Sequence, residues 1–186
     1  IKNLYSQATN SIIISVGDYP ITRLDLVKEI KLVAILSNTQ INNENQEQIK
    51  ALAVKSLIKR NIKKSEIEKR NIDRYNPEQL ENLINNASRK LGVNKDGLRQ
   101  ILEKHGLSFE NLVKRFKIDL KWNYMIFQMY KNKISLNTAE IEDKIKLRLE
   151  NLKDTDDKKS VELIKEQIVS AEKEKKLQMF SNLHYS

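Results

Sequence analysis

The chain has 186 residues, with 34 Lys and Arg against 25 Asp and Glu, a formal net charge of +9, four glycines, two prolines and no cysteine. The lack of cysteine excludes disulfide scaffolds, thiol nucleophiles, zinc ribbons and iron–sulfur sites, and two histidines argue against multi-histidine metal sites and Ser-His-Asp catalysis. Few glycines and prolines argue against a sheet-rich sandwich, and no apolar run approaches the roughly 20 residues of a membrane span. We therefore predict a mainly α protein with no membrane span.

The N-terminal part predicts a strand followed by a helix. Residues 1–10 show no periodicity and are expected to form a loose lead-in. The β-branched run at residues 12–16 predicts a short strand that ends in a turn. Thr22 is followed three residues later by Asp25, the pattern of a capping box, and apolar residues at helical spacing then predict a helix to about residue 36.

A second helix is expected after the polar, Asn-rich residues 37–48, with a short continuation to about Tyr75. Its apolar stripe leaves room for a basic cluster, made of Lys55, Lys59, Arg60, Lys63 and Lys64. A basic helix face can bind nucleic acid, but 26 of the 34 basic residues are Lys, and Arg is the better residue for bidentate phosphate or guanine contacts. This skew argues against a nucleic-acid partner.

The middle of the chain predicts three helices. Asn76 as N-cap with Pro77 at the first helical position is a strong start signal. A compact helix follows Asn94, and Ser108 caps the longest helical pattern, which covers residues 109–133.

The C-terminal part predicts two further helices. Asn137 opens a helix with apolar residues at helical spacing, and the acidic residues 154–157 form the clearest hydrophilic break in the chain. A final helix is expected over residues 161–180, and residues 183–186 have the character of the beginning of a strand.

The chain contains no recognisable catalytic, metal or cofactor motif. His105 precedes Gly106 at a predicted helix C-terminus, where a cation is favoured by the helix dipole, and His184 is expected at the surface. The four glycines are isolated from one another, so no Gly-rich phosphate loop exists and no nucleotide is expected. We expect a protein that is not an enzyme.

The long helix is apolar on two sides, which requires either enclosure on both sides or a partner on one. One side carries Ile118, Trp122, Met125 and Met129, followed by Tyr130, and other apolar residues, three phenylalanines among them, lie on the opposite side. These five residues are our candidate binding site for apolar segments of a client, since Met and Trp adapt to varied shapes. A central core helix would show the same pattern.

The order of these elements resembles that of the SurA-type periplasmic chaperones over roughly residues 11–143. The resemblance is carried by the following stretches: Gly17 to Leu26, Ala53 to Ile58, Leu91-Gly92-Val93, Leu98 to Leu102, His105 to Phe109, and Ile118 to Trp122.

This resemblance implies a helical module that shares its fold with the client-binding part of trigger factor. It implies one chaperone domain over residues 11–186, in which an N-terminal module (11–153) is completed by a C-terminal helix (158–186). The chain has no room for a parvulin prolyl isomerase domain. The expected function is therefore ATP-independent holding of unfolded outer-membrane proteins in the periplasm, without isomerase activity, after removal of a signal peptide.

Two other functions stay open. One is a cytoplasmic, trigger-factor-like holdase, and the other is a basic helical protein that binds nucleic acid through residues 55–64. The oligomeric state does not follow from the sequence.

Overall fold

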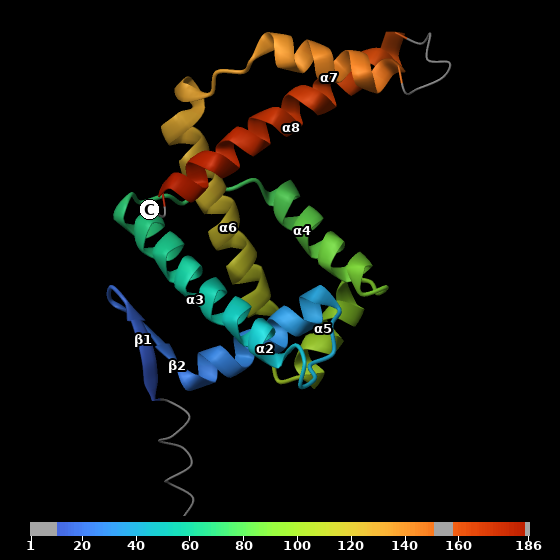
Figure 1. Ribbon diagram of the computed structural model, residues 1–186. Helices are drawn as coiled ribbons and strands as arrows, with labels where there is room; N and C mark the ends of the chain where they lie inside the picture. The colour runs from blue at the N-terminus through green and yellow to red at the C-terminus, as the bar shows by residue number, and fades with distance from the viewer. Residues whose placement is uncertain (1–10, 151–157, 185–186) are drawn as a thin grey trace, which may run out of the picture. The chain divides into compact units, whose positions relative to one another are not determined.

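The computed structural model describes residues 11–150 and 158–184 of the chain (Figure 1). The structure is 76% helical, with seven α-helices and a short antiparallel sheet of two strands in the described part, which confirms the mainly α prediction. None of the described helices is long and apolar enough to cross a membrane. The chain forms two compact units, of which unit 1 ends at Trp122 and unit 2 begins at Asn123.

The described part of unit 1 begins with a β-hairpin. Strand β1 (Ile12–Val16) pairs antiparallel with β2 (Tyr19–Thr22), and the register is irregular between Ile12 and Ile14. Gly17, in the tight connection, has a φ of 55°, a conformation that glycine adopts without a steric penalty. The predicted strand is confirmed, whereas β2 was not predicted, because its Tyr-Pro sequence is typical of a turn.

Helix α2 (Arg23–Ser37) starts at the predicted capping box. The Asp25 backbone N–H donates to Thr22 Oγ1 at 3.1 Å, and the Thr22 N–H donates to Asp25 Oδ2 at 2.9 Å. Asn38 ends the helix in a left-handed conformation.

Helix α3 (Gln46–Lys69) is continuous and packs along α2. It ends before the expected continuation to Tyr75, because the chain turns at Asn71, which has a φ of 51°.

Three predicted helix starts are confirmed in α4 (Pro77–Lys90), α5 (Lys95–Lys104) and α6 (Phe109–Tyr130). Asn76 Oδ1 accepts the backbone N–H of Glu78 at 2.9 Å, and Asn94 Oδ1 accepts that of Gly97 at 2.8 Å. A short 3₁₀ turn (Lys131–Lys133) follows α6.

The largest apolar cluster of unit 1 joins α4, α5 and the beginning of α6, and leucines of α2 pack against it. Its buried members are Leu80, Ile84, Leu98, Leu102, Leu107, Phe109, Leu112 and Leu120. This cluster fixes the first half of α6 against its neighbours, so the side chains of α6 that face α2 and α3 have a defined position.

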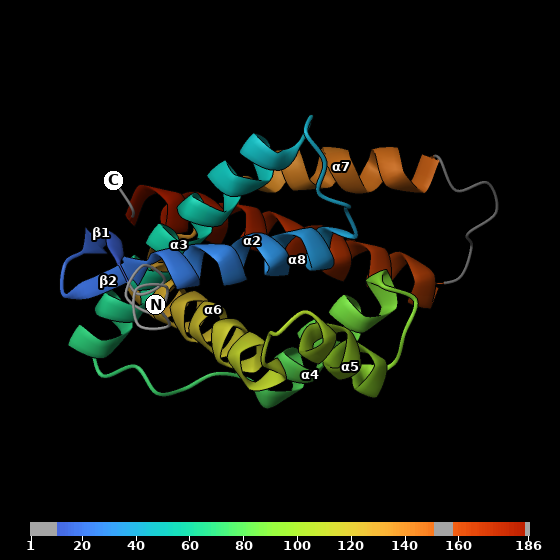
Figure 2. The ribbon, with the colours of Figure 1, turned by 90° about the horizontal axis from the view of Figure 1, so that it is seen from below.

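Unit 2 contains helices α7 (Thr138–Glu150) and α8 (Lys158–His184), which lie side by side (Figures 1 and 2). Lys144 Nζ of α7 lies 2.7 Å from Glu172 Oε1 of α8 and also pairs with Glu140 on its own helix. Phe180 of α8 stacks on Tyr130, with ring centroids 4.6 Å apart.

The C-terminal expectations are partly wrong. Leu183 and His184 belong to α8 and begin no strand, since the helical hydrogen-bonding pattern continues to His184. His184 is half-buried, with its Nδ1 3.3 Å from the hydroxyl of Tyr130, instead of lying free on the surface. The lead-in, the acidic break at 154–157 and residues 185–186 lie outside the described residues. The single domain over 11–186 stays a prediction.

Candidate functional site

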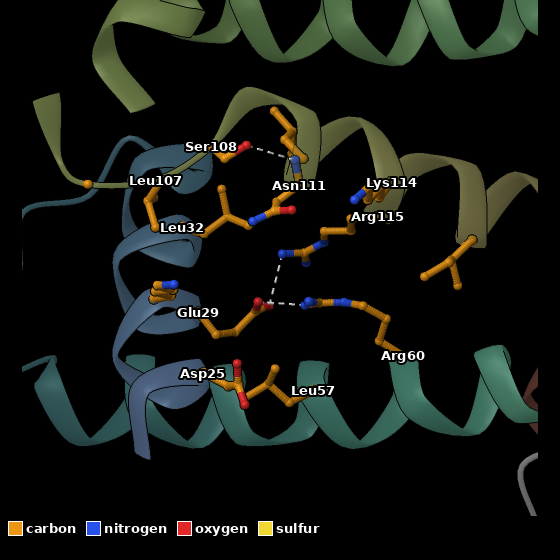
Figure 3. A pocket seen from close by; sticks show the side chains of 14 residues that line it. Asp25, Glu29, Leu32, Leu57, Arg60, Leu107, Ser108, Asn111, Lys114 and Arg115 are labelled. Carbon is orange, nitrogen blue, oxygen red and sulfur yellow. Dashed lines mark hydrogen bonds and ion pairs between the residues drawn. The ribbon is translucent and has the colours of Figure 1, made fainter. Parts of the chain in front are cut away.

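A pocket of about 300 Å³ opens within unit 1 between α2, α3 and the beginning of α6 (Figure 3). Its lining combines leucines with four cationic and two anionic side chains. The three helices supply the wall together, so the pocket exists only in the folded unit.

The Glu29 carboxylate of α2 is the central group of the pocket and is 3% exposed. Glu29 Oε2 lies 2.5 Å from Arg60 Nη2 of α3, and Glu29 Oε1 accepts from Arg115 Nη1 of α6 at 2.8 Å. Arg115 Nη2 also donates to Ser56 Oγ at 3.2 Å. Figure 3 shows the guanidinium groups of Arg60 from α3 and Arg115 from α6 directed at Glu29 of α2. One buried carboxylate therefore links all three helices.

Burial of Arg115 lowers the pKa of its guanidinium below the usual value, and the nearby Glu29 charge opposes this shift. Arg115 and Arg60 have side chains that are 20% and 23% exposed. Both groups therefore lie in an environment where electrostatic interactions are stronger than in water.

The remaining charged residues of the pocket are Asp25, Lys28 and Lys114. Asp25 Oδ2 is held by the backbone N–H and the hydroxyl of Thr22 in the capping box. Lys28 and Lys114 are exposed, and neither has an ionic or hydrogen-bonding partner among the residues that the structure describes. Both acids of the pocket thus have polar partners, whereas its cations Lys28 and Lys114 have none among the residues that the structure describes.

The apolar wall is formed by side chains from all three helices and from the loop before α6. Leu57, Leu107 and Leu112 are buried, and Leu32 and Ile118 are half-buried. The pocket therefore offers an apolar surface beside its cationic groups.

The beginning of α6 is held by polar contacts. Ser108 Oγ accepts the backbone N–H of Asn111 at 3.3 Å, and Arg99 Nη1 donates to Glu110 Oε1 at 2.7 Å. The backbone N–H of Glu110 itself, the Ser108 hydroxyl and Arg99 together lower the pKa of the Glu110 carboxyl to about 2. The dipole of α6 also stabilises an ionised carboxylate at this position, because Glu110 lies in the first turn of the helix.

The five predicted client-binding residues occupy different environments. Trp122 and Met125 are 0% and 1% exposed, so they offer no surface in this conformation. Ile118, Met129 and Tyr130 are half-buried, Ile118 lines the pocket and Tyr130 stacks on Phe180. No observation here tests whether these side chains bind a client, and the assignment stays a prediction.

Three of the five cations on the predicted basic face of α3 have anionic partners. Arg60 pairs with Glu29, Lys63 with Asp119 of α6, and Lys64 lies near Glu68 and over the ring of Tyr19. These pairs reduce the net positive charge that this face can offer to phosphates.

Four charged residues of the pocket were not predicted from the sequence: Lys28, Glu29, Lys114 and Arg115. Apolar spacing alone is misleading here, because the apolar Leu24 and Val27 of α2 are 36% and 45% exposed, whereas Glu29 is buried. The available signal is that Glu29 lies between the apolar Leu26 and Leu32 at helical spacing, where an acid requires a cationic partner.

In the described ranges, no group of three or more His, Asp or Glu side chains could hold a metal ion. Comparisons with protein-family models, with curated proteins and with solved structures found no match.

Proposed function

We propose that this protein is an ATP-independent chaperone that holds unfolded proteins by their apolar segments, without prolyl isomerase activity. The observation that carries the proposal is the surface of unit 2. Among its described residues, three hydrophobic side chains are buried, whereas five large ones are 44–60% exposed. The exposed ones are Phe127, Leu147, Leu163, Met179 and Leu183.

Such an excess of exposed apolar side chains favours a binding role, because water-exposed apolar surface is stabilised when a partner covers it. Met179 and Leu183 lie one turn apart on α8, with Lys175 one turn earlier, and line the same shallow hollow. Covering the exposed half of each apolar side chain contributes about 1 kcal/mol. Two or three such contacts give the weak and broad affinity that a holdase requires.

The client class and the compartment follow from the resemblance to the SurA-type chaperones alone. On that basis the clients are unfolded outer-membrane proteins and the compartment is the periplasm. The same surface would serve a cytoplasmic, trigger-factor-like holdase equally well.

Nucleic-acid binding is the weaker alternative. The ion pairs of Arg60 and Lys63 reduce the free positive charge of the basic face of α3. A nucleic-acid complex would lose affinity steeply as salt rises, whereas an apolar complex would not.

The test is the suppression of aggregation of an unfolded outer-membrane protein at two salt concentrations. Replacing Met179 and Leu183 by Ser is expected to raise the protein concentration needed for half suppression about thirty-fold, since two apolar contacts of about 1 kcal/mol each are lost. The matched control replaces Asn123 and Gln167, exposed residues of unit 2 that do not line this hollow, by Ser and is expected to behave like the unmodified chain.

Circular dichroism should show the same helix content for both double variants, because all four side chains are exposed. The proposal is wrong if the unmodified chain does not suppress aggregation, or if the Met179/Leu183 variant suppresses it as well as the control. Turnover of a proline peptide by the chain would contradict the absence of isomerase activity.

A further inference from the structure

We propose that the pocket between α2, α3 and α6 binds a monocarboxylate that carries an apolar group. This site is in unit 1 and does not depend on the proposed client binding of unit 2. Its ligand class follows from the charges, the free donors and the walls of the pocket, taken in turn.

The charge balance of the pocket favours an anion. Its four cations, Lys28, Arg60, Lys114 and Arg115, face the two acids Asp25 and Glu29, which leaves two positive charges in excess (4 − 2). Glu29 already accepts a hydrogen bond from Arg115 and forms an ion pair with Arg60, and Asp25 is held by the capping box.

The free hydrogen-bond donors favour a carboxylate in particular. Arg60 contacts Glu29 and Ser56 through Nη2 alone, so its Nε–H and Nη1–H have no partner among the residues that the structure describes. A guanidinium presents its N–H groups as a planar fork, which matches the two oxygens of a carboxylate. The Arg60 side chain is 23% exposed, so these donors lie beside protein and are only partly hydrated. The ammonium groups of Lys28 and Lys114 add charge from α2 and α6.

The walls favour a ligand with an apolar group. Leu32, Leu57, Leu107, Leu112 and Ile118 border the same space as the charged groups. The volume of about 300 Å³ lies at the small end of ligand pockets, which span roughly 300–1,000 Å³. A short alkyl chain or a single ring fits this size. The same chemistry occurs in a free organic acid and in the C-terminal residue of a polypeptide that ends in an apolar side chain.

The first experiment is calorimetric titration of the full chain with octanoate, octanol and acetate. Octanoate is expected to bind at least about five-fold more tightly than either of the others, because it alone uses both the cationic groups and the apolar wall. Equal affinities for octanoate and octanol would overturn the proposal, because the charges would then contribute nothing.

The second experiment locates the site with matched charge variants. Replacing Lys28 and Lys114 by Gln is expected to weaken octanoate binding about five-fold, as two ion pairs at partly exposed sites are lost. The control replaces Lys55 and Lys104 by Gln, which removes the same charge from exposed positions that do not line the pocket. Equal affinities of the two double variants for octanoate would place binding elsewhere and refute the site.

A steric variant gives an independent check that does not alter charge. Asn111 is exposed and lines the pocket, so Asn111→Phe should fill it without disturbing the core and should abolish octanoate binding. Unchanged octanoate affinity in Asn111→Phe, with unchanged helix content, would also refute the site.

A short peptide that ends in Leu distinguishes the two sources of the ligand. Binding of the peptide with a free carboxylate, and none of its C-terminal amide, would identify polypeptide ends as ligands. Binding of octanoate without binding of either peptide would identify a free acid.

Discussion

The buried Glu29 should contribute more to stability than any exposed acid of the chain. Glu29→Gln keeps the shape of the side chain but removes the charge that two guanidinium groups share. A hydrogen bond to a charged group contributes about 1.5–3 kcal/mol, and Glu29 accepts one from Arg115 and forms an ion pair with Arg60. Because Arg60 and Arg115 keep about a fifth of their side chains exposed, water replaces part of the lost interaction. The expected loss of unfolding free energy is therefore about 3 kcal/mol, the lower end of the range for breaking a buried ion pair.

Urea denaturation followed by circular dichroism measures this loss. With a slope of about 2 kcal/mol per molar urea, the midpoint of Glu29→Gln should fall by about 1.5 M. The control is Glu47→Gln, because Glu47 is 78% exposed and its ion pair with Lys50, at 3.5 Å, should contribute less than about 0.5 kcal/mol.

A third variant separates the charge from the packing. Replacing Glu29 by Leu together with Arg60 and Arg115 by Met removes all three charges at similar volume, and it should restore most of the stability, since no unpaired charge is left. A loss of less than about 1 kcal/mol in Glu29→Gln, as small as in the Glu47 control, would refute the reasoning, because the carboxylate would then not hold the three helices together.

Three smaller predictions follow from other contacts. Thr22→Ala should cost about 1 kcal/mol of unfolding free energy in urea denaturation, because it removes the N-cap of α2. The pKa of Glu110, lowered to about 2 from an ordinary 4.5, stabilises the fold above pH 4.5, and this contribution is lost as the pH falls toward 2. The melting temperature of Glu110→Gln should therefore depend less on pH between about 5 and 2 than that of the unmodified chain, and equal slopes would contradict the assignment. Met125→Ser should destabilise the protein by about 2–4 kcal/mol, and Met129→Ser by less than half of that, because Met125 is 1% exposed and Met129 is half-buried. Equal losses in thermal denaturation would show that the two side chains are packed alike.

Local signals in the sequence predicted most of the helix starts. The capping box of Thr22 and the sequence Asn76-Pro77 act within three residues, so the chain itself carries the information. Strand β2 could not be predicted in this way, because Pro20 is typical of a turn and is accepted here at the edge of a two-stranded sheet.

The candidate pocket could not be predicted from the sequence. Glu29 and Arg115 are 86 residues apart, and their contact depends on how α2 and α6 are rotated about their axes. Helical periodicity indicates which residues share a face, but the exposed fractions of Leu24 and Val27 show that it does not determine which face is covered. The same limitation applies to α6, where two apolar faces are visible in the sequence and tertiary packing decides which of them remains available.

Trp122 is the only tryptophan of the chain and is fully buried at the last residue of unit 1. Its fluorescence therefore reports on a single position, with no second indole to obscure the signal. A blue-shifted emission spectrum and slow quenching by iodide are expected for the folded chain, and a red shift would mark entry of water at the middle of α6. The protein thus carries an intrinsic optical probe. Changes in the exposure of Trp122 to water can be followed with it in real time during binding, without any added label.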